Sequence, residues 1–183
     1  MYPVLVPSLN VLVGMAAIDE QIADDTRQEG CPHCGGPLHR ATWQRQPRGA
    51  GDDLPKSCTT RWGLCCAWCR KRVLPDSVLF CGRHVYLKAV MLLVVAARQR
   101  QLSPTSMGKL RALFGVSAET IRRWLDVFLE RLPEASAWMR RRGRISPRVR
   151  DSEVPAALLD WLLEILGDVD KALVQAATLV PGL

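Results

Sequence analysis

The chain has 183 residues and a formal net charge of +7, with 48% hydrophobic and 23% charged residues. These values are typical of a globular protein and exclude a chain that is disordered throughout. The longest uninterrupted apolar run, residues 89–97, is far shorter than the roughly 20 residues of a membrane-spanning helix. The first 15 residues carry two prolines and no basic residue, so we expect neither a signal peptide nor a membrane protein.

The positive charge is concentrated in the middle of the chain. Residues 1–30 contain one arginine and five acids, a net −4, and residues 151–183 contain one lysine and six acids, a net −5. Residues 31–150 therefore carry 23 basic and seven acidic residues, a net +16. A basic block between acidic ends is typical of a core that binds a polyanion, although an unevenly charged solvated surface gives the same pattern.

The hydrophobic pattern predicts one amphipathic helix over residues 8–27, then a region of strands, then helices to the end of the chain. The expected strands are residues 38–45, 59–65 and 72–80, with a polar loop over 46–57. The expected later helices are residues 86–100, 104–114, 118–132 and 134–142, and two that follow N-caps at Ser152 and Asp168. The helix over 86–100 is apolar on nearly every side, which predicts a buried position. Pro133 is expected to end the helix over 118–132.

Six of the seven cysteines fall between positions 31 and 69, and such clustering indicates metal ligation rather than disulfides in a reducing compartment. This group of cysteines contains two CxxC pairs, at residues 31–34 and 66–69. Two tight CxxC turns joined by strands present four thiolates in a tetrahedral arrangement, which suits zinc. We therefore expect one structural Zn²⁺ held by Cys31, Cys34, Cys66 and Cys69.

Other roles for these cysteines stay open. Cys65 could replace the adjacent Cys66 as a ligand. Cys81 and His84 form a C-x-x-H pair that could serve a second site with Cys58, although burial as small hydrophobic residues is the simpler expectation for these thiols. The tetrapeptide Cys-Pro-His-Cys also matches the active site of periplasmic thioredoxin-fold oxidoreductases, which requires a helix N-terminus. The Gly-Gly-Pro that follows is poor helix sequence, so this enzyme class is a remote alternative.

Residues 109–124 match the helix-turn-helix pattern, with Gly115 in the turn and Ser117 as the cap of the second helix. The side chains expected to hold the two helices together are Leu110, Leu113, Val116, Ile121, Trp124 and Leu125. The open face of the second helix, which enters the DNA major groove in this motif, carries Ser117, Ala118, Glu119, Thr120, Arg122 and Arg123. Arg111 departs from the pattern, because that position is usually small. A plain helical hairpin with a Glu119–Arg123 surface pair is the alternative.

Six arginines fall within residues 140–150, a stretch that Gly143 and Pro147 interrupt. This composition predicts an extended arm that follows phosphates or enters a minor groove. The DNA contacts expected from it are Arg140, Arg141, Arg142 and Arg144. A solvated linker is the alternative.

Residues 31–130 resemble the DNA-binding portion of bacterial insertion-sequence transposases and the stand-alone zinc-ribbon and helix-turn-helix proteins of mobile elements. The resemblance rests on the CPxCG turn at residues 31–35, on the second CxxC followed by basic residues, and on the GVSxxTIxRW segment at 115–124. It implies recognition of element ends or of a promoter. We recognise no nuclease domain after residue 130, and we expect Asp160 and Glu164 to face solvent rather than bind metal.

The sequence thus predicts an α+β, mainly α protein: a helical segment over 1–30, a four-cysteine zinc ribbon over 31–84, a helix-turn-helix domain over 85–142, and a basic linker with acidic helices over 143–183. The acidic helices are expected to pack on the basic core or to form a homodimer surface. The predicted function is non-catalytic, sequence-specific binding of double-stranded DNA in the bacterial cytoplasm, at the nucleoid. The process would be transposition, recombination or transcription of a mobile element. The main alternative is an adaptor that binds a recombinase, a transposase or RNA polymerase.

Overall fold

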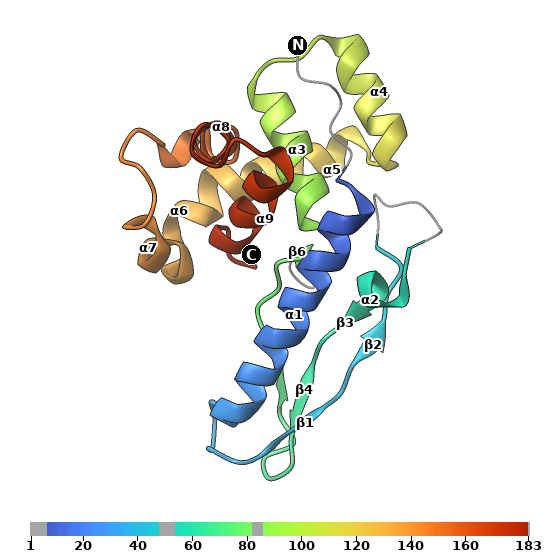
Figure 1. The fold of residues 1–183 in the computed structure, drawn as a ribbon, viewed down its shortest axis with the longest axis vertical. Coiled ribbons are helices and arrows are strands. Elements are labelled where there is room, and N and C mark those ends of the chain that lie inside the picture. Colours follow the sequence, from blue (N-terminus) through green and yellow to red (C-terminus); the bar gives the residue numbers. More distant parts are fainter. Residues whose placement is uncertain (1–6, 48–53, 82–85, 183) are drawn as a thin grey trace.

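The structure is a computed structural model that describes residues 7–47, 54–81 and 86–182. It is mainly helical with small sheets, as the sequence predicts. The strands β1–β4 extend to one end of the molecule and helices α3–α9 gather at the other, with α1 running alongside (Figure 1). The helices are α1 Leu9–Glu29, α2 Lys56–Thr59, α3 Lys88–Gln99, α4 Pro104–Phe114, α5 Ala118–Asp126, α6 Leu132–Glu134, α7 Ser136–Arg142, α8 Ala156–Leu166 and α9 Val169–Leu179. In these three ranges of the chain, no helix has the length and hydrophobicity needed to cross a bilayer.

The strands are shorter than the sequence predicts and form three antiparallel sheets. Strand β4 (Leu64–Cys66) lies between β1 (Leu38–Arg40) and β5 (Arg72–Val73), while β2 (Trp43–Gln44) pairs with β3 (Thr60–Arg61). The expected strands 38–45 and 59–65 are both interrupted where the ring of Trp43 covers Gly63, which has room for no Cβ. The two segments remain joined at this level, because the N–H of Ala41 donates to the Gly63 carbonyl at 2.8 Å.

The expected strand 72–80 is also interrupted, for a different reason. Between β5 and β6 (Phe80–Cys81), the backbone N–H groups of Val78 and Leu79 donate to the carboxylate of Asp19 on α1 instead of to a neighbouring strand. Strand β6 pairs with β7 (Tyr86–Leu87), so the helix predicted from residue 86 begins two residues later.

Helix α3 lies at the centre of the helical part, as its apolar sequence predicts. Eight of its twelve residues are buried, and it packs against α4, α5, α8 and α9. The acidic C-terminal helices thus pack on the rest of the molecule, which confirms the first of the two expectations for them. Their predicted cap at Ser152 is wrong: Ser152 lies in a 3₁₀ turn, and α8 begins after Pro155. Asp168 caps α9 as expected.

Pro133 does not end the helix before it. A π-helical turn, Val127–Arg131, follows α5 and leads directly into α6, which includes Pro133. Proline cannot donate to the carbonyl of residue i−4, and its ring clashes with that carbonyl in a regular α-helix. The backbone N–H of Leu132 bonds instead to Val127, five residues back, so the wider turn accommodates the proline.

A buried polar network joins the N-terminal helix to the C-terminal one. Asp19 on α1 accepts hydrogen bonds from the Ser77 hydroxyl and from the N–H groups of Val78 (2.5 Å) and Leu79 (3.3 Å). Lys88 Nζ donates to the carbonyl oxygens of Ser77, Ala177 and Val180. Burial raises the pKa of Asp19 and lowers the pKa of Lys88, because desolvation disfavours the charged form of each group. Residues 77–79 thereby connect α1, α3 and α9.

Candidate metal centre and nucleic-acid interface

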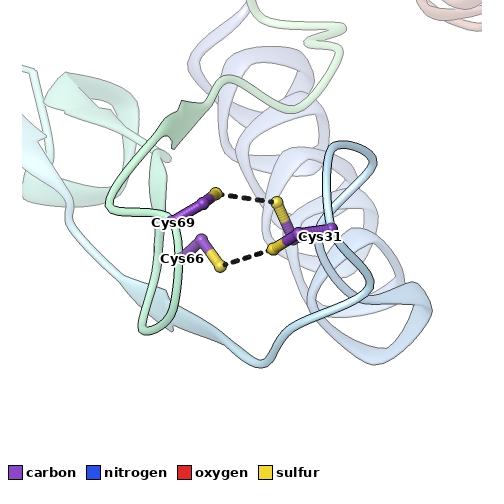
Figure 2. A group of neighbouring side chains, drawn as sticks. Cys31, Cys66 and Cys69 are labelled. Carbon is purple, nitrogen blue, oxygen red and sulfur yellow. Dashed lines mark hydrogen bonds between the residues drawn. The ribbon is translucent and has the colours of Figure 1, made fainter.

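The four cysteines of the two CxxC pairs come together at the end of the molecule opposite the helices. The sulfur atoms of Cys31, Cys34, Cys66 and Cys69 all lie within 4.8 Å of one another and could hold a metal ion. The sulfur atoms of Cys31 and Cys69 are 3.6 Å apart (Figure 2). Those of Cys34 and Cys66 are 3.5 Å apart. Four thiolates around one Zn²⁺ have sulfurs about 3.8 Å apart, given Zn–S bonds of about 2.3 Å, whereas a disulfide requires about 2.05 Å. The observed spacing fits shared coordination.

Two equivalent turns position these thiols. In the first, the N–H of Gly35 donates to the Cys31 carbonyl (2.8 Å), and Gly35 has a left-handed φ of +70°. In the second, the N–H of Arg70 donates to the Cys66 carbonyl (3.2 Å), and Arg70 has a left-handed φ of +60°. Pairing of β1 with β4 places Leu38 opposite Cys66, which brings the two turns face to face.

The electrostatics of the cluster favour a cation. The backbone N–H groups of Cys69 and, secondarily, Trp68 donate to the sulfur of Cys66 and lower its pKa to about 6, against the effect of burial. The N–H of Lys71 acts in the same sense on Cys69, but burial and the neighbouring sulfurs outweigh it and raise the pKa of Cys69 to about 12. Four crowded thiols thus cannot all ionise alone, and a bound divalent cation removes this repulsion.

The structure places the three remaining thiols outside the cluster. The sulfur of Cys65 is directed to the carbonyl oxygens of Cys66 and Arg70 and is outside the cluster, so Cys66 is the cluster member. Cys58 and Cys81 are buried in the main hydrophobic core, as small hydrophobic residues are. His84 lies outside the described residues. Cys31 follows the C-terminal end of α1 rather than starting a helix, so the geometry expected of a thiol oxidoreductase is missing at this turn.

Helices α4 and α5 meet at a sharp turn, and both pack on α3. Gly115, which the sequence places in the turn, has a left-handed φ of +58°, and the Ser117 hydroxyl accepts from the Thr120 N–H (3.1 Å). The ring of Trp124 on α5 meets Tyr86 edge-on, with centroids 5.1 Å apart. The buried side chains on these elements are Met107, Leu110, Phe114, Val116, Ile121 and Trp124. Leu113 is 53% exposed, so its predicted role between the helices is wrong, and Phe114 is buried instead.

The outer face of α5 presents the residues that the sequence analysis selected. The side chains of Arg122 and Arg123 are 69% and 73% exposed, while Ser117, Ala118 and Glu119 are exposed and Thr120 is half-buried. Glu119 pairs with Arg122 and, at 3.3 Å, with Arg123. Exposed ion pairs of this kind contribute about 0–1 kcal/mol, so both guanidinium groups are available to another anion.

A groove of about 440 Å³ separates α4 from α5, with Arg98, Arg111 and Arg122 among its lining residues. Leu102, Met107 and Ile121 contribute apolar surface. Arg111, the large residue at a position that the motif usually fills with a small one, is exposed and lines this groove. The sequence predicted neither the groove nor the position of Arg98 in it, because both depend on how the helices pack together.

The prediction of an extended arginine arm is wrong. Arg140, Arg141 and Arg142 belong to helix α7 rather than to an extended segment. Arg141 donates to the carboxylate of Asp76 and to the Thr178 carbonyl, and Arg142 pairs with Asp151 and donates to the carbonyl of Val149. Arg140 and Arg144 are exposed. The expectation of an arm failed because two of its arginines hold the C-terminal region in place.

The acidic residues of α8 do not form a metal site in the described part of the chain. Asp160 pairs with Arg100, and Glu164 is exposed. The four-cysteine cluster is the one group of potential metal ligands found among residues 7–47, 54–81 and 86–182. Comparisons with protein-family models, with curated proteins and with solved structures gave no match for this chain.

Proposed function

We propose that the protein is a zinc-binding, non-catalytic, sequence-specific binder of double-stranded DNA. The observation that carries the proposal is the division of α5 into two faces. Ile121 and Trp124 anchor one face in the core, while Arg122 and Arg123 extend from the other into solvent. A helix held in this way behind a tight turn is the arrangement with which helix-turn-helix proteins read the major groove.

The charges around α5 support the same proposal. Arg98 and Arg111 line the groove beside α5 together with Arg122, and no described acidic residue pairs with Arg98 or Arg111. Arginines that flank a recognition helix bind phosphates and orient the protein on the duplex. We assign base contacts to Arg122 or Arg123 and phosphate contacts to Arg98, Arg111, Arg140 and Arg144. Arg141 and Arg142 leave the predicted contact set because of their internal partners.

The metal centre has a structural role in this proposal. Zn²⁺ suits four thiolates at this spacing, and Cys31, Cys34, Cys66 and Cys69 would hold it. When bound, zinc supplies the attraction that keeps the two CxxC turns together. We further propose that the protein acts at the bacterial nucleoid as an accessory or regulatory factor of a mobile element, in transposition, recombination or transcription. This last step rests on the resemblance of residues 31–130.

An adaptor function has one observation in its favour. Ile165 and Leu166 at the end of α8 are 59% and 38% exposed, and Glu164 beside them is exposed too. Paired apolar residues at a helix end are suited to a contact with a recombinase, a transposase, RNA polymerase or a second copy of the chain.

Selection from a randomised duplex library tests the proposed function. The full-length zinc-loaded protein should enrich one sequence, and that sequence should bind at least about 1,000-fold more tightly than a scrambled duplex. Matched selection with Arg123→Ala should lose or alter the enriched sequence. Salt-dependent binding without any enrichment would reduce the protein to a general polyanion binder, and no binding at all would favour the adaptor.

A further inference from the structure

The two CxxC turns share a backbone but differ in what they expose. After its second cysteine the first turn continues with Gly35, Gly36 and Pro37, whereas the second continues with Arg70, Lys71 and Arg72. All three basic residues of the second turn are exposed. The second turn also carries Trp68 between its cysteines, and this side chain is 71% exposed, the most exposed large hydrophobic residue in the described chain.

Trp68 is held in place although it is exposed. A Cβ added to Gly36 would lie 2.8 Å from two atoms of the Trp68 ring, so the ring rests directly on the glycine backbone of the first turn. Only glycine permits this approach. The ring therefore packs against the first turn while most of its surface remains open to solvent beside the four-cysteine cluster.

Arg70 occupies a position that the fold would fill better with glycine. Its φ of +60° matches the +70° of Gly35 at the equivalent place in the first turn, and a left-handed backbone is unfavourable for any residue with a Cβ. Arg70 thus keeps an exposed, charged side chain at a position where the backbone favours glycine. Arg70, Lys71 and Arg72 form no ion pair with another residue in the parts of the chain that the structure describes.

We propose that this surface, defined by Trp68, Arg70, Lys71 and Arg72, binds single-stranded nucleic acid. An exposed indole stacks on a base only where the face of that base is free, which a continuous duplex does not offer. The adjacent cations would hold the phosphates on either side of the stacked base. Three consecutive cations without a paired acid favour a polyanion over a protein partner. The surface lies at the opposite end of the molecule from α5, so it would contact a different part of the nucleic acid (Figure 1).

Fluorescence anisotropy with a labelled 12-nucleotide oligo-dT and a 12-base-pair duplex tests the proposal on the full chain. Trp68→Ala should lower affinity for the single strand about 10- to 100-fold and leave duplex affinity within about twofold. Trp68→Phe should restore most of the lost affinity, because it keeps an aromatic face. Leu74→Ala is the matched control, since Leu74 is an exposed apolar residue in the same part of the chain. Metal content is measured in every variant to show that the cluster is intact.

Arg70→Gly separates function from folding at this surface. Relief of the left-handed strain should raise the melting temperature by about 3 °C. Affinity for the single strand should fall, and the slope of log affinity against log salt concentration should become shallower by about 0.7. The proposal is overturned if the wild type does not bind oligo-dT, if Trp68→Ala behaves like Leu74→Ala, or if single strand and duplex lose affinity equally. Arg123→Ala should leave oligo-dT binding unchanged, so failure of the α5 assignment would be seen separately.

Discussion

The two ends of this molecule are stabilised in different ways. The helical end has a continuous hydrophobic core built on α3, with Leu92, Phe128 and Trp138 fully buried. The four-cysteine end has a separate core of only four buried residues, and two of those are the metal-ligand candidates Cys31 and Cys66. So few buried side chains cannot offset the entropy of ordering two turns and three short strands. We therefore expect the helical end to fold by burial of apolar side chains and the four-cysteine end to need a bound metal ion.

Loss of the metal should therefore separate the two ends. Cys34→Ser removes one ligand and should abolish metal binding, which contributes on the order of 10 kcal/mol in structural zinc sites. The amide signals of residues 31–73 should lose their dispersion in NMR spectra, while the helical signal in circular dichroism persists.

Cys65→Ser is the matched control for this experiment, because Cys65 adjoins a ligand but lies outside the cluster. It should retain the metal. Complete loss of helical structure in Cys34→Ser would mean that the two ends fold as one unit.

A cavity in the helical core should destabilise the helical end and leave metal binding intact. Leu92→Ala removes a fully buried side chain from α3 and should lower the free energy of unfolding by about 3 kcal/mol. Metal stoichiometry should stay at one per chain. Leu113→Ala is the control, and its effect should be within about 0.5 kcal/mol because the side chain is exposed. Urea unfolding measures both, and equal costs would contradict the burial assignment.

The buried hydrogen-bond network around Asp19 should contribute less to the free energy of unfolding than the core does. Asp19→Ala leaves the buried N–H groups of Val78 and Leu79 without an acceptor and should cost about 2 kcal/mol. Asp25, an exposed acid on the same helix that pairs only locally with Gln21, offers the control Asp25→Ala. Similar urea midpoints for the two variants would show that this network contributes nothing to stability.

The same carboxylate predicts a pH dependence. Burial raises the pKa of Asp19 in the folded state above its ordinary value of 3.8, against the hydrogen bonds that lower it. The folded state therefore holds this proton more tightly than the unfolded state. The contribution of Asp19 to stability is full below about pH 3.8 and declines as the pH rises through the folded-state pKa. The stability of Asp19→Asn relative to wild type should increase over that range, and a decrease would show that the hydrogen bonds outweigh burial.

Sequence patterns predicted what depends on local spacing. The CxxC pairs, the turn at Gly115 and the cap at Ser117 were all recognisable, because each requires a particular residue type at a particular offset. The long buried helix was recognisable from its uninterrupted apolar composition.

Features that depend on distant partners were not predictable. The ring of Trp43 packs on Gly63 in another segment, and Asp19 accepts hydrogen bonds from residues 77–79, which are at least 58 residues away in the sequence. The arginines at 141 and 142 resembled a DNA arm because their carbonyl and carboxylate partners are invisible in a local pattern. The position of Trp68, between two candidate metal ligands and just before three basic residues, is a weak sequence pattern for a binding surface.

The reading of DNA by α5 is tested most directly by single substitutions measured on two duplexes. Arg122→Ala and Arg123→Ala are titrated with the selected sequence and with a scrambled one, beside Arg140→Ala, an exposed arginine on α7. At least one α5 variant should lose about 10- to 100-fold on the selected sequence and less than threefold on the scrambled one, because a bidentate arginine–guanine contact discriminates by about 1–3 kcal/mol. Arg140→Ala should weaken both equally and lower the salt slope by about one. Equal losses on both duplexes for both α5 variants would contradict the assignment of α5 as the reading helix.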